Sequence, residues 1–354
     1  MKNVKRITSW IVLSLVIQSV VLLYLDRQYF TNETNFKVKK IETPTAKQPK
    51  EEVVVKIPDN AKHVSVSYDG KFLAYYDNSI LKVTNTLTGV TNDVAFEKEE
   101  KVSFYKWLPD TNLMIIAQKK VTQKEQVITF SNYDAPKNKK REISNDNRGR
   151  NISITLPDTQ SEVEDIELSP LTNMIYVKIN HKGNRNTIYS MNVMAQVDKL
   201  KLNTYFAGSI LTFPHEARMA YEDKTYNRIY VTGVNKPISI NGVTKPSLIA
   251  TDDENRLYIG QLNNSNKIDK IYYGMVKEAT DKWKTIELKA PIEEKDLYIS
   301  ASGGIYINNN LKGIVTDMLT GKEIEYTGKF LMMFNGGIAS VSEGKLVKIP
   351  LEKK

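Results

Sequence analysis

The 354-residue chain contains no cysteine and only three histidines. The absence of cysteine excludes disulfide bonds, thiol nucleophiles and zinc sites built on thiolates. The histidines, His63, His181 and His215, lie far apart in the sequence and lack the paired spacing of a zinc-binding helix. The chain also lacks the G-x-S-x-G motif that carries the nucleophile of an α/β-hydrolase. We therefore expect a protein that is not an enzyme and that uses no cofactor or metal ion.

Long apolar runs are absent except for one, at residues 7–25. As a helix, this run matches the thickness of the hydrocarbon core of a bilayer. Three basic residues precede it: Lys2, Lys5 and Arg6. By the positive-inside rule we expect a cytoplasmic tail at 1–6, a single-pass transmembrane anchor at 7–25 and an extracytoplasmic remainder. A cleaved signal peptide is the alternative, but the run is long for one and no small-x-small cleavage site follows it.

Residues 26–60 have the composition of a linker rather than of a folded domain. They are polar and charged, and they include Pro44, Pro49 and Pro58. Such a composition favours an extended stalk. The short apolar stretch at 53–55 could pair as a strand, so the boundary with the folded domain at 61–354 stays open by several residues.

A short motif recurs through residues 61–354, with Asn or Gly, one variable residue and then apolar or aromatic residues. Its seven copies begin at Gly70, Asn112, Asn173, Asn227, Asn255, Gly303 and Gly336. Asn and Gly reach the positive φ angles of tight hairpin turns, and the apolar residues suit the inner strands of a packed sheet. The mean spacing of about 44 residues equals the length of a four-stranded propeller blade. The pattern predicts an all-β protein.

The number of blades is less certain than their existence. Seven copies favour a seven-bladed β-propeller, but the interval between Asn227 and Asn255 is too short for a blade, so six or eight blades remain as alternatives. A second echo links Thr84–Gly89 with Thr316–Gly321, and we interpret both as the later hairpin of a blade. Helical periodicity is rare, and Ser190–Leu202 is the one stretch that could form a short amphipathic helix.

The first repeat carries a family resemblance. Residues Ser67–Tyr75 (SYDGKFLAY) resemble the S-x-D-G-[KR]-x-[LI]-[AV] signature of WD40-like propellers related to TolB and to the N-terminal propeller of dipeptidyl peptidase IV. Trp107–Asp110 and Leu168–Leu171 are similar to it in looser form. The layout of anchor, charged stalk and propeller also resembles surface proteins of clostridial-type Gram-positive bacteria. The resemblance implies a fold and a location, because such propellers serve many functions.

The longest interval between motif copies, from Asn112 to Asn173, contains a basic insertion. Its six basic residues are Lys137, Lys139, Lys140, Arg141, Arg148 and Arg150. We expect this loop to contact an anionic partner, with an affinity that falls as salt rises. The alternative is a solvated insertion without a partner. Few aromatic residues lie nearby, which argues against nucleic acid.

Other polar and aromatic residues are interpreted as structural. The acidic run of Glu162, Glu164, Asp165 and Glu167 is expected to be a solvated face. Trp107 is expected to pack in the core, whereas Trp283 lies among charged residues and is expected to be half-exposed on an outer strand.

Taken together, these features favour a non-enzymatic, membrane-tethered extracytoplasmic β-propeller that acts as a binding or scaffolding module at the cell surface. The expected partners are the lipid bilayer, through residues 7–25, and either a protein or an anionic cell-envelope polymer, but no nucleic acid. One alternative is an envelope sensor or an accessory subunit of a membrane complex. Another is a propeller enzyme acting on cell-wall glycans, which would need paired carboxylates at the mouth of the channel.

Overall fold

The computed structural model describes residues 2–25, 53–122, 125–145 and 150–351. The chain divides into two units, 1–52 and 53–354. The first contains one helix, α1 (Lys2–Leu25), whose described side chains, from Trp10 to Leu25, are all exposed. Within the described ranges, no helix combines the length and the hydropathy that a membrane crossing requires.

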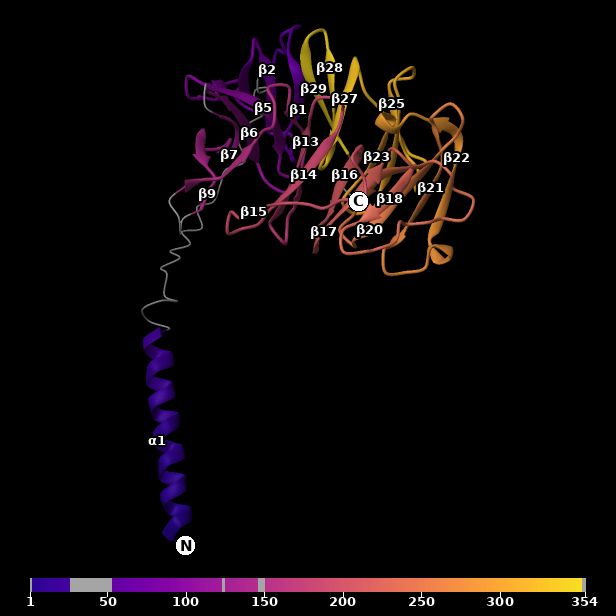
Figure 1. Ribbon diagram of the computed structural model, residues 1–354. Helices are drawn as coiled ribbons and strands as arrows, with labels where there is room; N and C mark the ends of the chain where they lie inside the picture. Colours follow the sequence, from indigo (N-terminus) through magenta and orange to yellow (C-terminus); the bar gives the residue numbers. More distant parts are fainter. Residues whose placement is uncertain (1, 26–52, 123–124, 146–149, 352–354) are drawn as a thin grey trace, which may run out of the picture. The chain divides into compact units, whose positions relative to one another are not determined.

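The second unit is a seven-bladed β-propeller, as the repeats predicted (Figure 1). Blade 1 contains β1 (Lys62–Val66), β2 (Phe72–Asp77), β3 (Ile80–Asn85) and β4 (Thr91–Asp93). Blade 2 contains β5 (Glu100–Trp107), β6 (Leu113–Val121), β7 (Gln126–Asp134), β8 (Lys139–Glu142) and β11 (Ser153–Thr155). A separate two-stranded ribbon is formed by β9 (Ser144–Asn145) and β10 (Arg150–Asn151). Blade 3 contains β12 (Glu162–Ser169), β13 (Met174–Asn180), β14 (Asn186–Met191) and β15 (Val197–Lys199).

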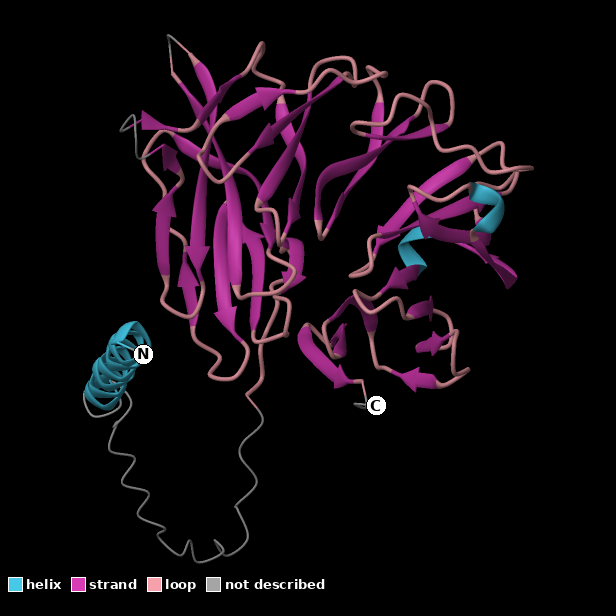
Figure 2. Cartoon of the chain, turned by 90° about the horizontal axis from the view of Figure 1, so that it is seen from below, coloured by secondary structure: helices cyan, strands magenta, loops and turns pink. Residues whose placement is uncertain are grey.

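The remaining four blades complete the ring, which Figure 2 shows from below. Blade 4 contains β16 (Ala207–Phe213), β17 (Glu216–Asp223) and β18 (Arg228–Val231). Blade 5 contains β19 (Pro246–Thr251), β20 (Arg256–Leu262), β21 (Ile268–Met275) and β22 (Lys284–Ile292). Blade 6 contains β23 (Leu297–Ile299), β24 (Ile305–Asn309), β25 (Ile314–Asp317) and β26 (Glu323–Glu325). Blade 7 contains β27 (Lys329–Phe334), β28 (Gly337–Ser342) and β29 (Lys345–Pro350). Two short 3₁₀ helices, η2 (Thr280–Lys282) and η3 (Glu294–Asp296), lie beside these strands.

The hydrophobic core is distributed over the junctions between blades. Seven clusters of buried residues are present in the described chain, and each joins one blade to the next. The second strand of a blade is buried on both faces, as the run of buried residues in β2 (FLAYYD) illustrates. Each blade therefore depends on its two neighbours for the burial of its apolar faces.

The ring is closed by a segment that precedes the first blade. Val55 and Ile57 are buried, and the Ile57 amide donates to the Gly344 carbonyl at 2.8 Å. Lys56 forms an antiparallel bridge with Lys345, which begins β29. The segment thus takes the place of a fourth strand on blade 7 and satisfies its edge. The propeller begins here, several residues before the boundary expected at residue 61.

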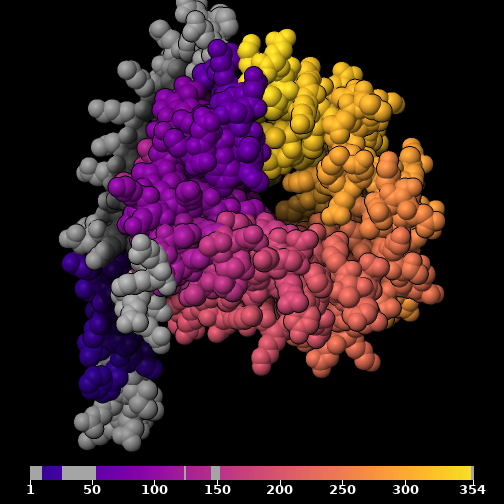
Figure 3. All heavy atoms as spheres, turned by 45° about the horizontal axis from the view of Figure 1, so that its top comes forward, coloured from indigo at the N-terminus to yellow at the C-terminus, as the bar shows by residue number. Residues whose placement is uncertain are grey.

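The innermost strands lie next to one another around a central channel, which Figure 3 shows as the opening in the surface. They are β1, β5, β12, β16, β19, β23 and β27. Six of the seven motif positions adopt positive φ, the exception being Asn112. In five of those six copies the turn leads into the second strand of a blade. In these five copies the motif marks the turn between the innermost strand and the second strand of a blade.

Two sequence expectations are corrected by the strand order. Asn227 precedes β18, the third strand of blade 4, whereas Asn255 precedes β20, the second strand of blade 5. The short interval between them therefore spans different positions of two complete blades. The segment Ser190–Leu202 is not helical, because its ends belong to the hairpin of β14 and β15. The repeated Thr84–Gly89 and Thr316–Gly321 turns do close the later hairpins of blades 1 and 6.

Candidate functional site

The basic insertion lies at the outer edge of blade 2. Both β8 and β11 pair with β7, so the outermost strand of this blade is split, and the β9–β10 ribbon is inserted between its halves. The insertion is therefore on the side of the blade away from the channel. Its position explains why the interval between motif copies is long, since the extra residues enter between the two halves of the outermost strand.

The described basic residues of this loop fall into two groups. Lys137 pairs with Asp134 at 2.8 Å, and Lys140 lies 4.5 Å from the centroid of the Phe96 ring. Lys139 and Arg141 are exposed and, being two residues apart on β8, lie on one face of that strand. Arg148 and the side chain of Arg150 lie outside the described residues. The expectation of an anionic partner at this loop stays a prediction.

A charged network joins the innermost strands of blades 2 and 3 beside the channel. The Lys106 ammonium on β5 lies 3.2 Å from Asp165 and 2.5 Å from Glu167, both on β12. Burial raises the pKa of Glu167 to about 7, with Asp165 adding to the shift and Lys106 opposing it. Burial lowers the pKa of Lys106, but the two carboxylates outweigh it, and the net shift is upward. Lys106 thus forms an ion pair with both carboxylates.

The other members of the acidic run are also paired, although Glu162 and Glu164 stay exposed, as a solvated face requires. Glu162 accepts hydrogen bonds from Lys119 and Ser103 of blade 2, both at 2.6 Å. Glu164 pairs with Lys178, the side chain of which is 5% exposed, at 3.0 Å. The pairing of β12 with β13 has a β-bulge at Glu164, between Val163 and Asp165. Glu164 and Asp165 have different lysine partners, Lys178 and Lys106. The run is a connector between blades.

The prediction is confirmed for one of the two tryptophans in the propeller and wrong for the other. Trp107 packs against the cluster between blades 1 and 2, as predicted. Trp283 is only 6% exposed and belongs to the cluster between blades 4 and 5, so the expectation of a half-exposed position is wrong. Its ring occupies the space left by Gly274, where a Cβ atom would come within 2.4 Å of the indole. The glycine at position 274, in the neighbouring strand β21, was the signal available in the sequence.

Blade 4, like blade 7, has only three strands that pair with one another. The loop 232–245 takes the place of the fourth strand. It forms one β-bridge, between Ile229 and Ile238, and packs Val234, Ile238 and Ile240 against the cluster between blades 4 and 5. Two cavities of about 390 and 280 Å³ open along the junction with blade 5. Both are lined by Asn227, Arg228 and Pro246, so we treat them together as the seam cavity.

Two consecutive carboxylates of β17 line the smaller part of the seam cavity. Glu222 accepts hydrogen bonds from the amides of Leu248 at 2.7 Å and Ser209 at 3.0 Å, which ties blade 4 to blade 5. Asp223 is 1% exposed, and its Oδ1 accepts from Thr204 at 2.7 Å and from the Thr225 amide at 3.0 Å. The second oxygen, Oδ2, has no partner among the described residues. Leaving such a group unpaired costs about 1–3 kcal/mol.

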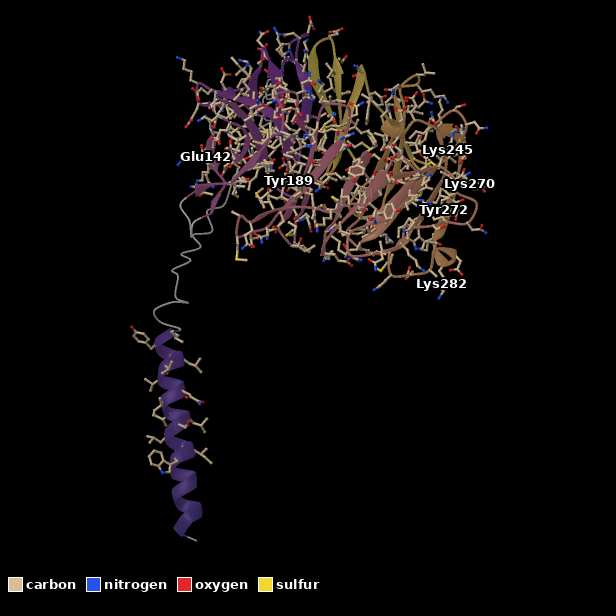
Figure 4. The ribbon with its side chains drawn as sticks, viewed as in Figure 1. Glu142, Tyr189, Lys245, Lys270, Tyr272 and Lys282 are labelled. Atoms are coloured by element: carbon tan, nitrogen blue, oxygen red, sulfur yellow. The ribbon has the colours of Figure 1, made fainter. Side chains whose placement is uncertain are left out.

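The rim of the seam cavity carries an aromatic ring and several cations. Tyr226 is 68% exposed, and the Arg228 guanidinium lies 5.5 Å from the centroid of its ring. Lys245 is exposed on the loop that leads into β19, at the end of blade 5 opposite to Lys282, as Figure 4 shows. Asn227 and Asn266 occupy positive-φ turn positions on either side. The sequence did not predict this site, because its residues come from turns and strand ends that lie apart in the chain.

Comparison with known proteins agrees on the fold and goes no further. No protein-family model and no curated protein matches the sequence. The β-propeller domain of Cps50 (Swd1) from Myceliophteria thermophila is similar in structure, with a TM-score of 0.50 and 11% identity over 82% of this chain and 96% of that one. Dipeptidyl peptidase 4 from Porphyromonas gingivalis matches with a TM-score of 0.44 and 11% identity over 75% of this chain and 45% of its own. At 11% identity, the likeness to the Cps50 domain shows the β-propeller fold alone.

Proposed function

We propose that this chain is a membrane-tethered, extracytoplasmic binding module that recognises an anionic polymer or a protein of the cell envelope and catalyses no reaction. The observation that carries this proposal is the seam cavity, which is open to solvent and has at its wall one buried carboxylate oxygen, Asp223 Oδ2, without a partner among the described residues. Concave sites with a few convergent polar groups are the usual places for ligands. The closed ring of blades supplies a rigid frame for such a site.

The tether is supported by the character of the N-terminal segment. From Trp10 to Leu25 the large apolar side chains are exposed on all sides of α1, from 37% at Leu25 to 68% at Trp10. A helix that is apolar all round suits a lipid environment rather than an aqueous one. Basic residues before the run favour a cytoplasmic N-terminus and an extracytoplasmic propeller.

The non-enzymatic part of the proposal is supported by the network beside the channel. A glycosidase uses one carboxyl group as an acid and a second as a base or nucleophile, with the substrate between them. Asp165 and Glu167 instead contact the same Lys106 ammonium. That lysine occupies the position a substrate would need.

Cosedimentation tests the proposed function. We would mix the full chain, purified in detergent, with isolated Gram-positive sacculi that retain their anionic polymers, at 50 mM and 500 mM NaCl. Because screening weakens contacts between exposed charges, we expect binding at low salt and a loss of tenfold or more at high salt. Sacculi stripped of anionic polymers are the control. Failure to sediment with either preparation at low salt would refute binding to an envelope polymer.

A further inference from the structure

The seam cavity combines a carboxylate oxygen, an aromatic face and cationic side chains in a space of a few hundred Å³. We propose that it binds an acidic saccharide unit, with Asp223, Tyr226, Arg228 and Lys245 as the residues that recognise it. This inference rests on the proposed function and deepens it, because it assigns both the site and the chemical class of the ligand.

Asp223 selects for a ligand with a hydrogen-bond donor. Its Oδ1 is already held by Thr204 and by the Thr225 amide, so the carboxylate cannot rotate without losing both contacts. The Oδ2 atom has no partner among the described residues and is itself buried, in a residue that lines the cavity and is 1% exposed. A sugar hydroxyl supplies the missing donor.

Tyr226 offers an apolar surface at the mouth of the cavity. Its ring is 68% exposed, and a solvent-exposed aromatic ring on a turn gains nothing for the fold. The Arg228 guanidinium lies 5.5 Å from the ring centroid and restrains it. A tyrosine held in this way can stack on the C–H face of a pyranose ring while Arg228 reaches the substituents of that ring.

The charges around the cavity favour an acidic rather than a neutral saccharide. Three cations, Lys224, Arg228 and Lys245, line it together with two carboxylates. Lys224 is paired with Glu222 at 2.5 Å, and the Asp223 carboxylate is left to hydroxyl donors. Arg228 and Lys245 therefore remain to receive a carboxylate or phosphate group on the sugar.

Polar hydroxyls, which both donate and accept, also match the remaining lining groups. The amides of Asn227 and Asn266 are exposed at two turn tips and provide one acceptor and two donors each. The larger part of the cavity also has apolar lining residues, among them Ile238, Ile240 and Val243. A free phosphate would use the cations but would leave Tyr226 without a role.

Calorimetry on the full chain in detergent tests the inference, with trigalacturonate as the acidic probe, maltotriose as the neutral one and inorganic phosphate as the plain anion. We expect trigalacturonate to bind at least tenfold more tightly than either. Asp223→Asn keeps the Oδ1 acceptor and replaces only Oδ2, so it should weaken binding tenfold or more. Tyr226→Ala and Lys245→Gln change exposed side chains and should each weaken binding by a similar factor.

Matched controls come from residues outside the cavity. Tyr205→Ala removes another exposed tyrosine, 78% exposed, and Lys282→Gln removes another exposed lysine of blade 5. Both should bind the probe as the unchanged chain does. If Asp223→Asn does not fold, the two rim variants decide the question.

Several results would overturn the inference. They are equal binding of maltotriose, phosphate that binds as tightly as trigalacturonate, or rim variants that behave like the controls. Cosedimentation with sacculi that persists in all three cavity variants would also overturn it while leaving the proposed function in place. If the unchanged chain does not sediment with sacculi at all, the proposed function itself is refuted.

Discussion

Turn residues with positive φ show how single side chains define this ring. Gly70 has φ of +70°, and a Cβ atom there would lie 2.8 Å from the Phe334 ring of blade 7. Gly321 has nearly the same φ, +71°, but nothing lies within 4 Å of the corresponding position. The first glycine is needed for both conformation and space, whereas the second is needed for conformation alone.

This pair gives a matched stability prediction. Gly321→Ala should lower the free energy of unfolding by about 1 kcal/mol, because only the left-handed backbone penalises alanine. Gly70→Ala should cost about 1–3 kcal/mol more, because the added methyl group must also displace the Phe334 ring. Urea denaturation of the two variants measures the difference. Equal costs would show that the blade 1 to blade 7 contact tolerates a methyl group.

Glu167 predicts a pH dependence of stability. Its pKa of about 7 lies above the ordinary value of 4.5, so the folded chain retains a proton that the unfolded chain releases. The stability from this group is complete below pH 4.5 and is lost as pH rises through 7. Between pH 5 and pH 8 the unchanged chain should lose on the order of 1–3 kcal/mol more than Glu167→Gln. Urea denaturation of both chains at the two pH values measures this, and an equal change in the free energy of unfolding for the two chains would contradict it.

Residue types predicted the turns better than they predicted burial. Asn and Gly mark positive φ because their local steric preference acts without help from the rest of the fold. The partners of the acidic run and the burial of Trp283 were not predicted, because a neighbouring blade supplies their environment. Glu162 meets a lysine from blade 2, and Trp283 meets the core of blade 4. No local pattern encodes those partners.

At the scale of strands and blades, ring closure depends on the segment before the first blade. Val55 and Ile57 are 4% and 8% exposed, and they join the cluster between blades 7 and 1. Deletion of residues 1–57 should lower the free energy of unfolding by about 3 kcal/mol or more, since two buried aliphatic side chains are lost. Deletion of residues 1–52 is the control and should leave stability nearly unchanged. Calorimetric unfolding of both chains measures this, and equal midpoints would argue against closure by this segment.

A half-buried lysine makes a second link across the same junction. Lys348 on β29 donates to the Gly70 carbonyl at 3.0 Å and to the Thr86 hydroxyl at 2.6 Å. Burial lowers the pKa of Lys348. Lys348→Met should destabilise the chain by about 1–3 kcal/mol, because both acceptors lose a charged donor. A chemical denaturation midpoint unchanged by the substitution would mean that water replaces the ammonium group.

The repeated elements were predictable in number but not in every position. Repeat spacing predicted seven blades because each blade needs the same turn and the same buried strand. Asn227 was assigned to the wrong turn, since the same local preference serves the turn before β18. The seam cavity was not predicted, because it arises where loop 232–245 replaces a strand and no sequence motif marks a strand that is missing.

The whole molecule contains a closed propeller and an N-terminal helix with apolar side chains on all sides. The ring explains how a chain without cysteine can be stable, because its junction clusters bury apolar side chains and so provide stabilisation that smaller domains obtain from disulfides. The central claim is that this ring is tethered on the extracytoplasmic side of a membrane and binds its ligand there.

Labelling of single cysteines in intact cells tests that claim most directly. Since the chain has no cysteine of its own, Leu311→Cys places one thiol at a side chain that is 99% exposed on the propeller. Lys2→Cys places one in the expected cytoplasmic tail. The account predicts that a membrane-impermeant maleimide labels the Leu311→Cys chain in intact Gram-positive cells and labels the Lys2→Cys chain only after lysis. Labelling of the Leu311→Cys chain only after lysis would contradict the account.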